Sequence, residues 1–401
     1  MVRRILIVGF CMLWTAPPAS AAERKGVRPL AEFEIAPDGD FVLLPLIIHS
    51  REYRFLVCTG LSTTVIDEKL RDELELPAAE SRNTGGNRGK KRYKLGARLG
   101  NFDLTFPAGV ETGDYTTMRE GLDLDFHGEL GMDVLQRYIV QIDFDEGILR
   151  FLPAVPTGSG EAIRIFQQGQ EYSVPILMLT VPGEKSQRFF VSTGRAGNSL
   201  DVDNKFLEEL EEDEHVTVLS KEKAVARTGT RSFQTVRIES IQIGSFRHEG
   251  IIANSGEGNS VGLSYLSRYL VTFDFPRARM YLKKGANFDT VDAPLNMWQV
   301  AVERDEKSVT VTQINPHGPA ARLGLLPGDR IETLNERHAE RLSSWQIRRV
   351  LGRCDLPLAA EVIRDGNLVT LKSEPLAGEK IPNEKVANEK VASDATNSKG
   401  E

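Results

Sequence analysis

Cysteine is scarce in this sequence, with three residues among 401. Cys11 lies in an apolar N-terminal segment that we expect to be removed, which leaves Cys58 and Cys354 in separate predicted modules. Folds that depend on disulfide bonds are dense in cysteine, so this chain is predicted to be stabilised by apolar cores instead. Its hydrophobic residues, 40% of the total, are sufficient to form them.

An excess of positive charge is also missing. The chain has 57 acidic and 50 basic residues and a formal net charge of −7, which argues against nucleic acid as a partner. The basic segment 86–94 is expected to be a solvated loop face. The sequence has no glycine-rich phosphate loop and no His or Cys cluster with metal-ligand spacing. We therefore expect no cofactor and no metal.

No apolar run reaches the length that a membrane-spanning helix requires. The segment Ile5–Trp14 follows Arg3 and Arg4 and precedes the small residues Ala19–Ala21, an arrangement typical of a signal peptide. We expect residues 1–21 to be cleaved and the protein to be periplasmic or secreted, in a bacterium. An uncleaved membrane anchor is the alternative.

The sequence contains an internal duplication. FLVCTG at Phe55–Gly60 matches FFVSTG at Phe189–Gly194, and the segments that begin at Leu130 and Val261 also match. Both halves consist of short runs rich in Val, Ile, Phe and Leu, bounded by Gly, Asn and Asp, a pattern typical of β-strands. Three short helices are predicted, over Asp67–Leu74, Met132–Arg137 and Asp203–Glu212.

Each half contains one motif of two apolar residues followed by X-Thr-Gly, where X differs between the halves. Two β units with this motif resemble the aspartic proteases of the retropepsin and pepsin type. The resemblance covers residues 32–284 and implies two lobes, 32–155 and 160–285. In that family X is an aspartate in each lobe, and the pair of carboxylates shares one proton and activates a water for attack on a peptide carbonyl. It also implies glycine-containing flaps, near Asn83 and Ala226.

This chain departs from the family at both X positions, which are Cys58 and Ser192. Neither side chain provides a carboxylate, so we expect no catalytic residues there. The loop frame is intact: the Thr hydroxyls are expected to bond between the lobes and the Gly residues to permit the backbone turn. Its members are Thr59, Gly60, Thr193 and Gly194. The resemblance therefore predicts an inactive pseudoprotease whose cleft binds extended peptides by strand addition.

Two enzymatic alternatives stay open. An active aspartic-type endopeptidase would need carboxylates from elsewhere, such as Asp67 or Asp201, or from a dimer; we expect both residues to be helix caps. A hydrolase that uses Cys58 would need a thiolate and an oriented base. None of the six histidines lies in the two Thr-Gly loops.

The segment 295–375 has a different pattern. Its Pro319-Ala320, Gly324-Leu325, Gly328-Asp329 and Val362–Gly366 motifs resemble bacterial PDZ domains. That resemblance implies binding of peptides or protein C-termini by β-augmentation, with the carboxylate held by one loop. This loop is expected at Leu295, Asn296, Met297 and Trp298, where the family usually has glycine and this chain has none. A module that only packs on the lobes is the alternative.

The last residues, 376–401, contain no aromatic residue and almost no bulky apolar one, so they are predicted to be a disordered tail. The prediction as a whole is a mainly β protein: a bilobal, acid-protease-like pair of β-barrels, followed by a C-terminal α+β PDZ domain. The sequence leaves the ligand and the oligomeric state open.

Overall fold

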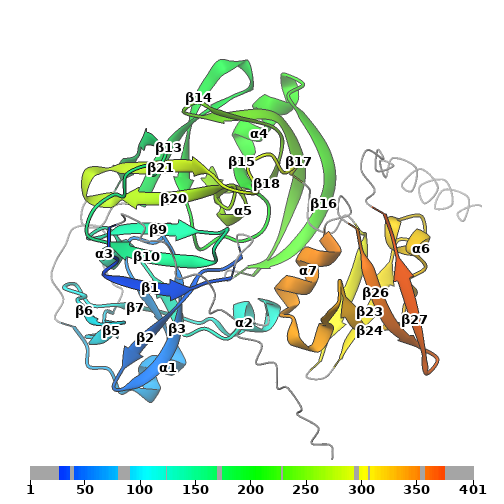
Figure 1. The fold of residues 1–401 in the computed structure, drawn as a ribbon, viewed down its shortest axis with the longest axis horizontal. Helices are drawn as coiled ribbons and strands as arrows, with labels where there is room; N and C mark the ends of the chain where they lie inside the picture. The colour runs from blue at the N-terminus through cyan, green and yellow to red at the C-terminus, as the bar shows by residue number, and fades with distance from the viewer. Residues whose placement is uncertain are drawn as a thin grey trace, which may run out of the picture.

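The fold is described from a computed structural model (Figure 1). The structure describes residues 27–36, 40–79, 91–122, 124–168, 174–226, 229–292, 298–305, 308–352 and 357–374. The predicted signal peptide and the predicted C-terminal tail lie outside these residues. The chain is mainly β, as predicted, because strands make up most of its regular structure and the helices are short.

The first sheet is formed by residues that flank the first Thr-Gly loop. It has seven strands. In spatial order they are β6 (Phe102–Leu104), β5 (Ala97–Leu99), β2 (Leu43–Ile48), β3 (Arg51–Val57), β8 (Gly128–Leu130), β4 (Val65–Asp67) and β7 (Glu111–Gly113). Side chains alternate between buried and more exposed along β2, as expected for a strand with one face in the core. The helices of this part are α1 (Glu68–Glu73), α2 (Thr116–Leu122) and α3 (Met132–Leu135).

The second sheet is formed by residues that flank the second Thr-Gly loop, and it has eight strands. In spatial order they are β12 (Phe166–Gln168), β13 (Val174–Val181), β14 (Lys185–Val191), β19 (Ser260–Val261), β15 (Leu200–Asp203), β18 (Phe246–Gly256), β17 (Gly229–Ile243) and β16 (Val216–Ala226). An additional pairing of Thr180 with Gln242 joins β13 to β17, so the sheet curls back on itself. Its helices are α4 (Asn204–Glu212) and α5 (Leu263–Leu266).

A six-stranded antiparallel joining sheet connects the two halves. Its order is β1 (Ala31–Glu34), β10 (Ile148–Leu152), β9 (Ile139–Asp143), β20 (Tyr269–Asp274), β21 (Arg279–Lys284) and β11 (Glu161–Arg164). Gln141 pairs with Thr272 at its centre, and these two residues are equivalent in the duplicated sequence. The Gln141 side-chain amide donates to Thr272 Oγ1 at 2.9 Å. The register therefore places a local two-fold axis at this pair, and one continuous apolar core runs through all three sheets.

The C-terminal sheet has a separate apolar core. Its main path is β22 (Val300–Arg304), β23 (Val309–Ile314), β24 (Arg330–Leu334), β26 (Ala359–Arg364) and β27 (Asn367–Lys372), and β25 (Arg337–His338) pairs with β24. Helices α6 (Pro319–Leu323) and α7 (Ser344–Gly352) complete this part. A hairpin turn at Asp365-Gly366, a dipeptide that favours such turns, joins β26 to β27, and both residues have a positive φ. Helix α7 faces α2 of the first half (Figure 1).

All three helices predicted in the duplicated region are present, with slightly different ends. Asp67 accepts a hydrogen bond from the Lys69 N–H at 2.7 Å and caps α1, as predicted. Helix α2 is a further helix of this region, which the sequence pattern did not predict. Among the described residues, no helix is long and apolar enough to cross a membrane.

Candidate functional site

The two Thr-Gly loops, residues 58–60 and 192–194, occupy equivalent places in the first and second sheets. The first follows β3 and the second follows β14, and each of these strands runs parallel to a very short strand, β8 or β19. The Cys58 N–H donates to Leu130 O at 3.0 Å, and the Ser192 N–H donates to Val261 O at 2.9 Å. The duplication seen in the sequence is therefore reproduced in the backbone of the site.

Thr59 and Thr193 bond the two loops to each other. The N–H of each threonine donates to the hydroxyl of the other at 3.1 Å. The Thr59 hydroxyl donates to Val191 O at 2.6 Å, and the Thr193 hydroxyl donates to Val57 O at 2.7 Å. Thr59 and Thr193 are buried. Each hydroxyl therefore provides a partner for two backbone groups, the N–H of the other threonine and a strand carbonyl. The predicted bonding between the loops is present.

Gly60 and Gly194 lie close to the side chain of the opposite loop. A Cβ at Gly60 would lie 2.8 Å from Ser192 Oγ, and a Cβ at Gly194 would lie 2.4 Å from Cys58 Sγ. Neither glycine has a positive φ. Both lie in turns, which the Leu61 N–H closes onto Cys58 O and the Arg195 N–H closes onto Ser192 O. The opposite loop leaves no room for a side chain at either position.

Cys58 is buried and its thiol is held in the protonated form. Burial is the largest cause, and the negative charge of Glu129 and a hydrogen bond to that side chain add to it. Together they raise the pKa of the thiol well above its ordinary value, although hydrogen bonds from the backbone of Gly60 and Gly194 act in the opposite direction. No histidine is among the groups that perturb the thiol. A thiol that stays protonated is a poor nucleophile.

We expect Cys58 to resist alkylation in the folded protein at neutral pH, because the thiolate is the reactive form. The measurement is the rate of reaction with a thiol reagent in a Cys354→Ser background, with and without denaturant. The reaction should be slow in the native state and fast after unfolding. Rapid stoichiometric modification of the native protein would contradict this environment for Cys58.

Glu129 is the acidic residue at the loops, and our reading of the sequence missed it. It lies in β8, where it pairs with Leu56 and Val65. Tyr115 Oη donates to Glu129 Oε2 at 2.6 Å, while Oε1 is 3.6 Å from the place where a Cβ at Gly194 would lie. The equivalent residue of the second half is Ser260 in β19. An acid at only one of two duplicated positions is the signal that could have identified it.

The two aspartates considered as replacement acids are occupied elsewhere. Asp67 is buried, caps α1 and forms an ion pair with Arg119. Asp201 lies inside β15, where it pairs with Arg195 and accepts a hydrogen bond from Ser260 Oγ at 3.2 Å.

The prediction that Asp201 caps a helix is wrong, because Asp203 caps α4. Helix α4 begins two residues further from its Thr-Gly loop than α1 does. The residue equivalent to Asp67 at the start of the helix is therefore Asp203, not Asp201.

Only part of the predicted flaps can be compared with the structure. Most of the first, residues 83–90, lies outside the described residues, and Tyr93 bridges to Ala78 and Val110 beyond it. At the second, Ala226 pairs with Gly229 at the end of the long β16–β17 hairpin. Residues 227–228 are not described.

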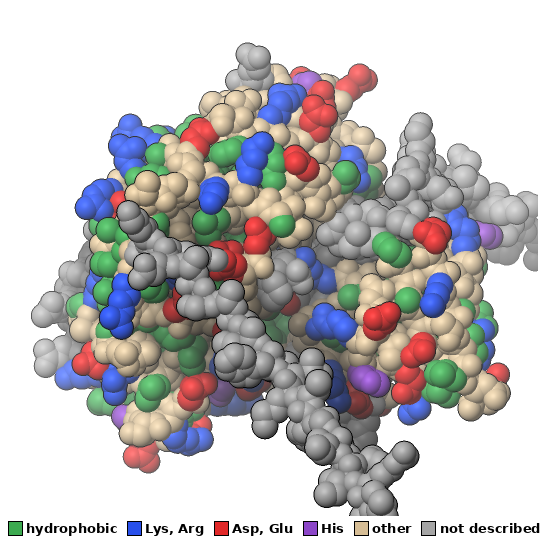
Figure 2. Space-filling model, viewed as in Figure 1, with side chains coloured by type: hydrophobic (Ala, Val, Ile, Leu, Met, Phe, Trp, Pro, Cys, Tyr) green, Lys and Arg blue, Asp and Glu red, His purple; other side chains and the backbone are tan. Residues whose placement is uncertain are grey.

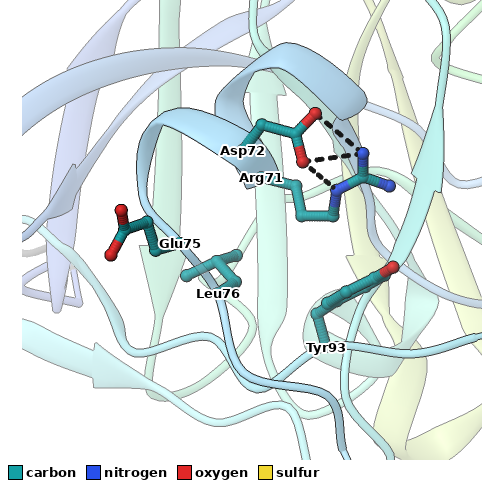
Figure 3. Close-up of a pocket in the computed structure, with 5 residues that line it drawn as sticks. All are labelled: Arg71, Asp72, Glu75, Leu76 and Tyr93. Carbon is teal, nitrogen blue, oxygen red and sulfur yellow. Dashed lines mark hydrogen bonds and ion pairs between the residues drawn. The ribbon is translucent and has the colours of Figure 1, made fainter.

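A surface groove of about 430 Å³ lies beside α1 (Figure 3). Its lining residues are Arg71, Asp72, Glu75, Leu76 and Tyr93. Arg71 Nε donates to Asp72 Oδ1 at 2.8 Å, so this guanidinium is paired at the rim. None of the residues of the Thr-Gly loops lines this groove. Among the described residues, no group of three or more His, Cys, Asp or Glu side chains is arranged to hold a metal ion.

The predicted carboxylate loop of the C-terminal part is described only at its end. Leu295, Asn296 and Met297 lie outside the described residues. The Trp298 side chain is fully buried, and the backbone N–H of Trp298 donates to Leu351 O at 3.3 Å. This N–H is therefore directed to the end of α7. Strand β22 stands at one end of the strand order of its sheet, as far as the described residues show.

Comparisons with known proteins add no relative. A scan against protein-family models finds no match for this chain, and a search of curated proteins finds no similar sequence.

Proposed function

We propose that this protein is an exported, aspartic-protease-like protein that lacks acid-dyad catalysis and binds peptides or protein segments. In this proposal residues 32–155 and 160–285 are the two lobes, and residues 295–375 are a PDZ-like module. The observation that carries the proposal is the reciprocal bonding of Thr59 and Thr193, with Cys58 and Ser192 at the positions of the acids. In this proposal the hydrogen bonds between the two Thr-Gly loops join the lobes, as in the family. The two aspartates that the family has in these loops are replaced.

The chemistry of the site supports binding over hydrolysis. A water held between two loops needs a group that accepts its proton and a group that protonates the leaving amine. The Cys58 thiol stays protonated at neutral pH, and the Ser192 hydroxyl is not a base. The resemblance of residues 295–375 to PDZ domains supports a second binding surface, since such domains bind extended peptides by β-augmentation.

The proposal is tested by the binding of a broad library of fluorescent peptides to the full chain. Each peptide is offered with a free and with an amidated C-terminus. We expect two classes: peptides that bind in both forms, through the cleft, and peptides that lose binding on amidation, through the PDZ-like module. A chain that binds no peptide of either kind would sink the proposal.

A single-carboxylate hydrolase is the second candidate, and Glu129 favours it. This carboxylate is hydrogen-bonded to the Cys58 side chain and is held by Tyr115. Any proteolysis by the full chain should then disappear in Glu129→Gln, which keeps the size of the side chain and removes its charge. Glu111→Gln is the matched control, since Glu111 is a buried glutamate of the same sheet, in β7. Activity that survives in Glu129→Gln would exclude this candidate.

Restoring the acids is a gain-of-function prediction. The double variant Cys58→Asp, Ser192→Asp is expected to cleave unfolded casein at acid pH, because two carboxylates at these positions can share one proton. Each single variant is the control and is expected to be inactive. An inactive double variant would show that the cleft has changed beyond the two acid positions.

A further inference from the structure

The two halves differ on the sheet face that carries Cys58 and Ser192. Because side chains alternate along a strand, Leu56 shares a face with Cys58, and Phe190 shares a face with Ser192. Leu56 and Phe190 are equivalent in the duplication, as are Arg54 and Arg188. A comparison of these pairs shows what each half places against the same surface.

In the first half this face is covered by the chain itself. Leu56 is 1% exposed and packs in a cluster with Phe41, Tyr115 and Phe126. Two of these aromatics come from residues 114–127, the covering segment, which connects β7 to β8 and includes α2. Met118 and Leu122 pack against the same cluster. Tyr115, Met118 and Leu122 recur at helical spacing, so the covering segment is amphipathic.

Two ion pairs join the covering segment to the first sheet. Arg54 forms an ion pair with Asp125 of the covering segment at 2.5 Å. Arg119 of the covering segment pairs with Asp67 and also donates to Phe126 O at 3.1 Å. The first half thus shows which chemistry this face accepts: aromatic and aliphatic side chains, an acid for the arginine and a base for the aspartate.

In the second half the covering segment is absent. Its place between β18 and β19 is taken by residues 257–259 alone. Phe190 is consequently 39% exposed, and Phe166 and Met178 beside it are 41% and 36% exposed. The register places Phe166, Ile176 and Phe190 in one row across three strands, in which the central Ile176 is buried and the two phenylalanines are partly exposed. Figure 2 shows Lys and Arg side chains next to hydrophobic ones in the region of β13 and β21.

The charged positions are also kept in the second half. Arg188, the equivalent of Arg54, is exposed and forms no ion pair within the part of the chain that the structure describes. Asp203, the equivalent of Asp67, accepts the cap bonds of α4 through Oδ1. Arg164 lies over the Phe166 ring at 4.9 Å. Two partly exposed phenylalanines, an arginine and an aspartate are thus left without the covering segment that the first half has.

We infer that this face of the second sheet, defined by Phe166, Met178, Arg188 and Phe190, binds an amphipathic segment of another protein. The segment carries aromatic and aliphatic side chains that cover Phe190 and an acidic side chain that pairs with Arg188. This surface goes beyond the proposed function, because it requires neither the PDZ-like module nor the Thr-Gly loops. Charge complementarity and the equivalent covered face of the first half both specify the chemistry of the partner.

The test uses a fluorescein-labelled peptide with the sequence of residues 113–127 of this chain, titrated with the full-length protein by anisotropy. We expect saturable binding that Phe190→Ala weakens at least about tenfold, as for an aromatic contact at the centre of an interface. Arg188→Asp should weaken it about fivefold, which is the upper range for an exposed ion pair. A peptide with Asp125→Arg should then regain affinity for the Arg188→Asp protein.

Two matched variants serve as controls. Leu368→Ala removes an exposed leucine, 59% exposed, from the C-terminal sheet. Arg247→Asp reverses an exposed arginine elsewhere on the second sheet. Neither should change the affinity. The inference is overturned if the peptide does not bind, or if Phe190→Ala and Arg188→Asp bind it as the controls do. It is also overturned if the protein self-associates through this face and Phe190→Ala restores the monomer, since the occupant is then a second copy.

Discussion

Replacing Thr193 by valine is expected to lower the free energy of unfolding of the duplicated region by about 2–4 kcal/mol. The substitution removes the hydroxyl that donates to Val57 O at 2.7 Å and accepts from the Thr59 N–H at 3.1 Å. Valine has nearly the same shape, so the loss arises from two buried backbone groups without partners rather than from a cavity. Each such group costs about 1–3 kcal/mol.

The measurement is urea unfolding of the full chain followed by circular dichroism. Thr370→Val is the matched control, because Thr370 is exposed in β27 and its change should be within about 0.5 kcal/mol. If Thr193→Val is no more destabilising than Thr370→Val, the reciprocal bonds do not hold the loops together. Thr59→Val should give a loss similar to that of Thr193→Val, because the two hydroxyls have equivalent partners.

The second large effect is expected at Asp329, in the C-terminal part. This carboxylate is 1% exposed and accepts from Arg364 Nε and a terminal Arg364 nitrogen, both at 2.7 Å. It also accepts from the Leu326 N–H at 2.8 Å. The Arg364 side chain is 27% exposed, so water can solvate its charge when Asp329 is removed. The Leu326 N–H and the guanidinium lose their buried acceptor, so Asp329→Ala should destabilise this part by about 2–3 kcal/mol.

The same residue predicts a pH dependence. Burial alone would raise the pKa of Asp329, but the hydrogen bonds from Arg364 and the Leu326 N–H and the charge of Arg364 together outweigh it, so the pKa lies below its ordinary value. A lowered folded-state pKa adds stability above the unfolded pKa of about 3.9. This stability is lost as the pH falls through the folded-state pKa. The C-terminal part should therefore lose stability in acid.

The check is thermal unfolding between neutral and acid pH. The melting temperature of the C-terminal part should fall more steeply in the wild type than in Asp329→Asn, which has no carboxylate to protonate. Asp365→Asn, at an exposed position of the neighbouring turn, should keep the wild-type slope. An Asp329→Asn protein with an unchanged pH slope would show that this pair does not couple protonation to folding.

Much of the strand pattern could be predicted from the sequence because the duplication fixes it. Two matched blocks around Cys58 and Ser192 implied equivalent strands and loops, and β3 and β14 have them. The turn at Asp365-Gly366 and the cap at Asp67 depend on local chemistry, which a short stretch of sequence contains in full.

The environment of the loops could not be predicted in the same way. Glu129 is far from Cys58 in the sequence and reaches it only because β8 pairs with β3. The match of Asp201 to Asp67 suggested a cap at Asp201, and this was misleading because the loop after Gly194 is longer than its equivalent after Gly60. The role of Gly60 and Gly194 depends on contacts across two sheets, which no local pattern encodes.

The exposure of Phe190 could not be predicted from the duplication either. Both halves share the apolar strand, so the sequence favours burial of Phe190 and Leu56 alike. Only the short connection between β18 and β19 distinguishes them, and its effect appears when the sheet is assembled.

The central claim is that the Thr-Gly loops are kept without the catalytic acids. Its most direct test is incubation of the full chain with unfolded casein from acid to neutral pH, with a transition-state peptide inhibitor of aspartic proteases or a thiol alkylator in parallel samples. The account predicts no cleavage at any pH, and cleavage only after both acids are restored at Cys58 and Ser192. Cleavage by the unaltered chain that the inhibitor blocks would contradict it.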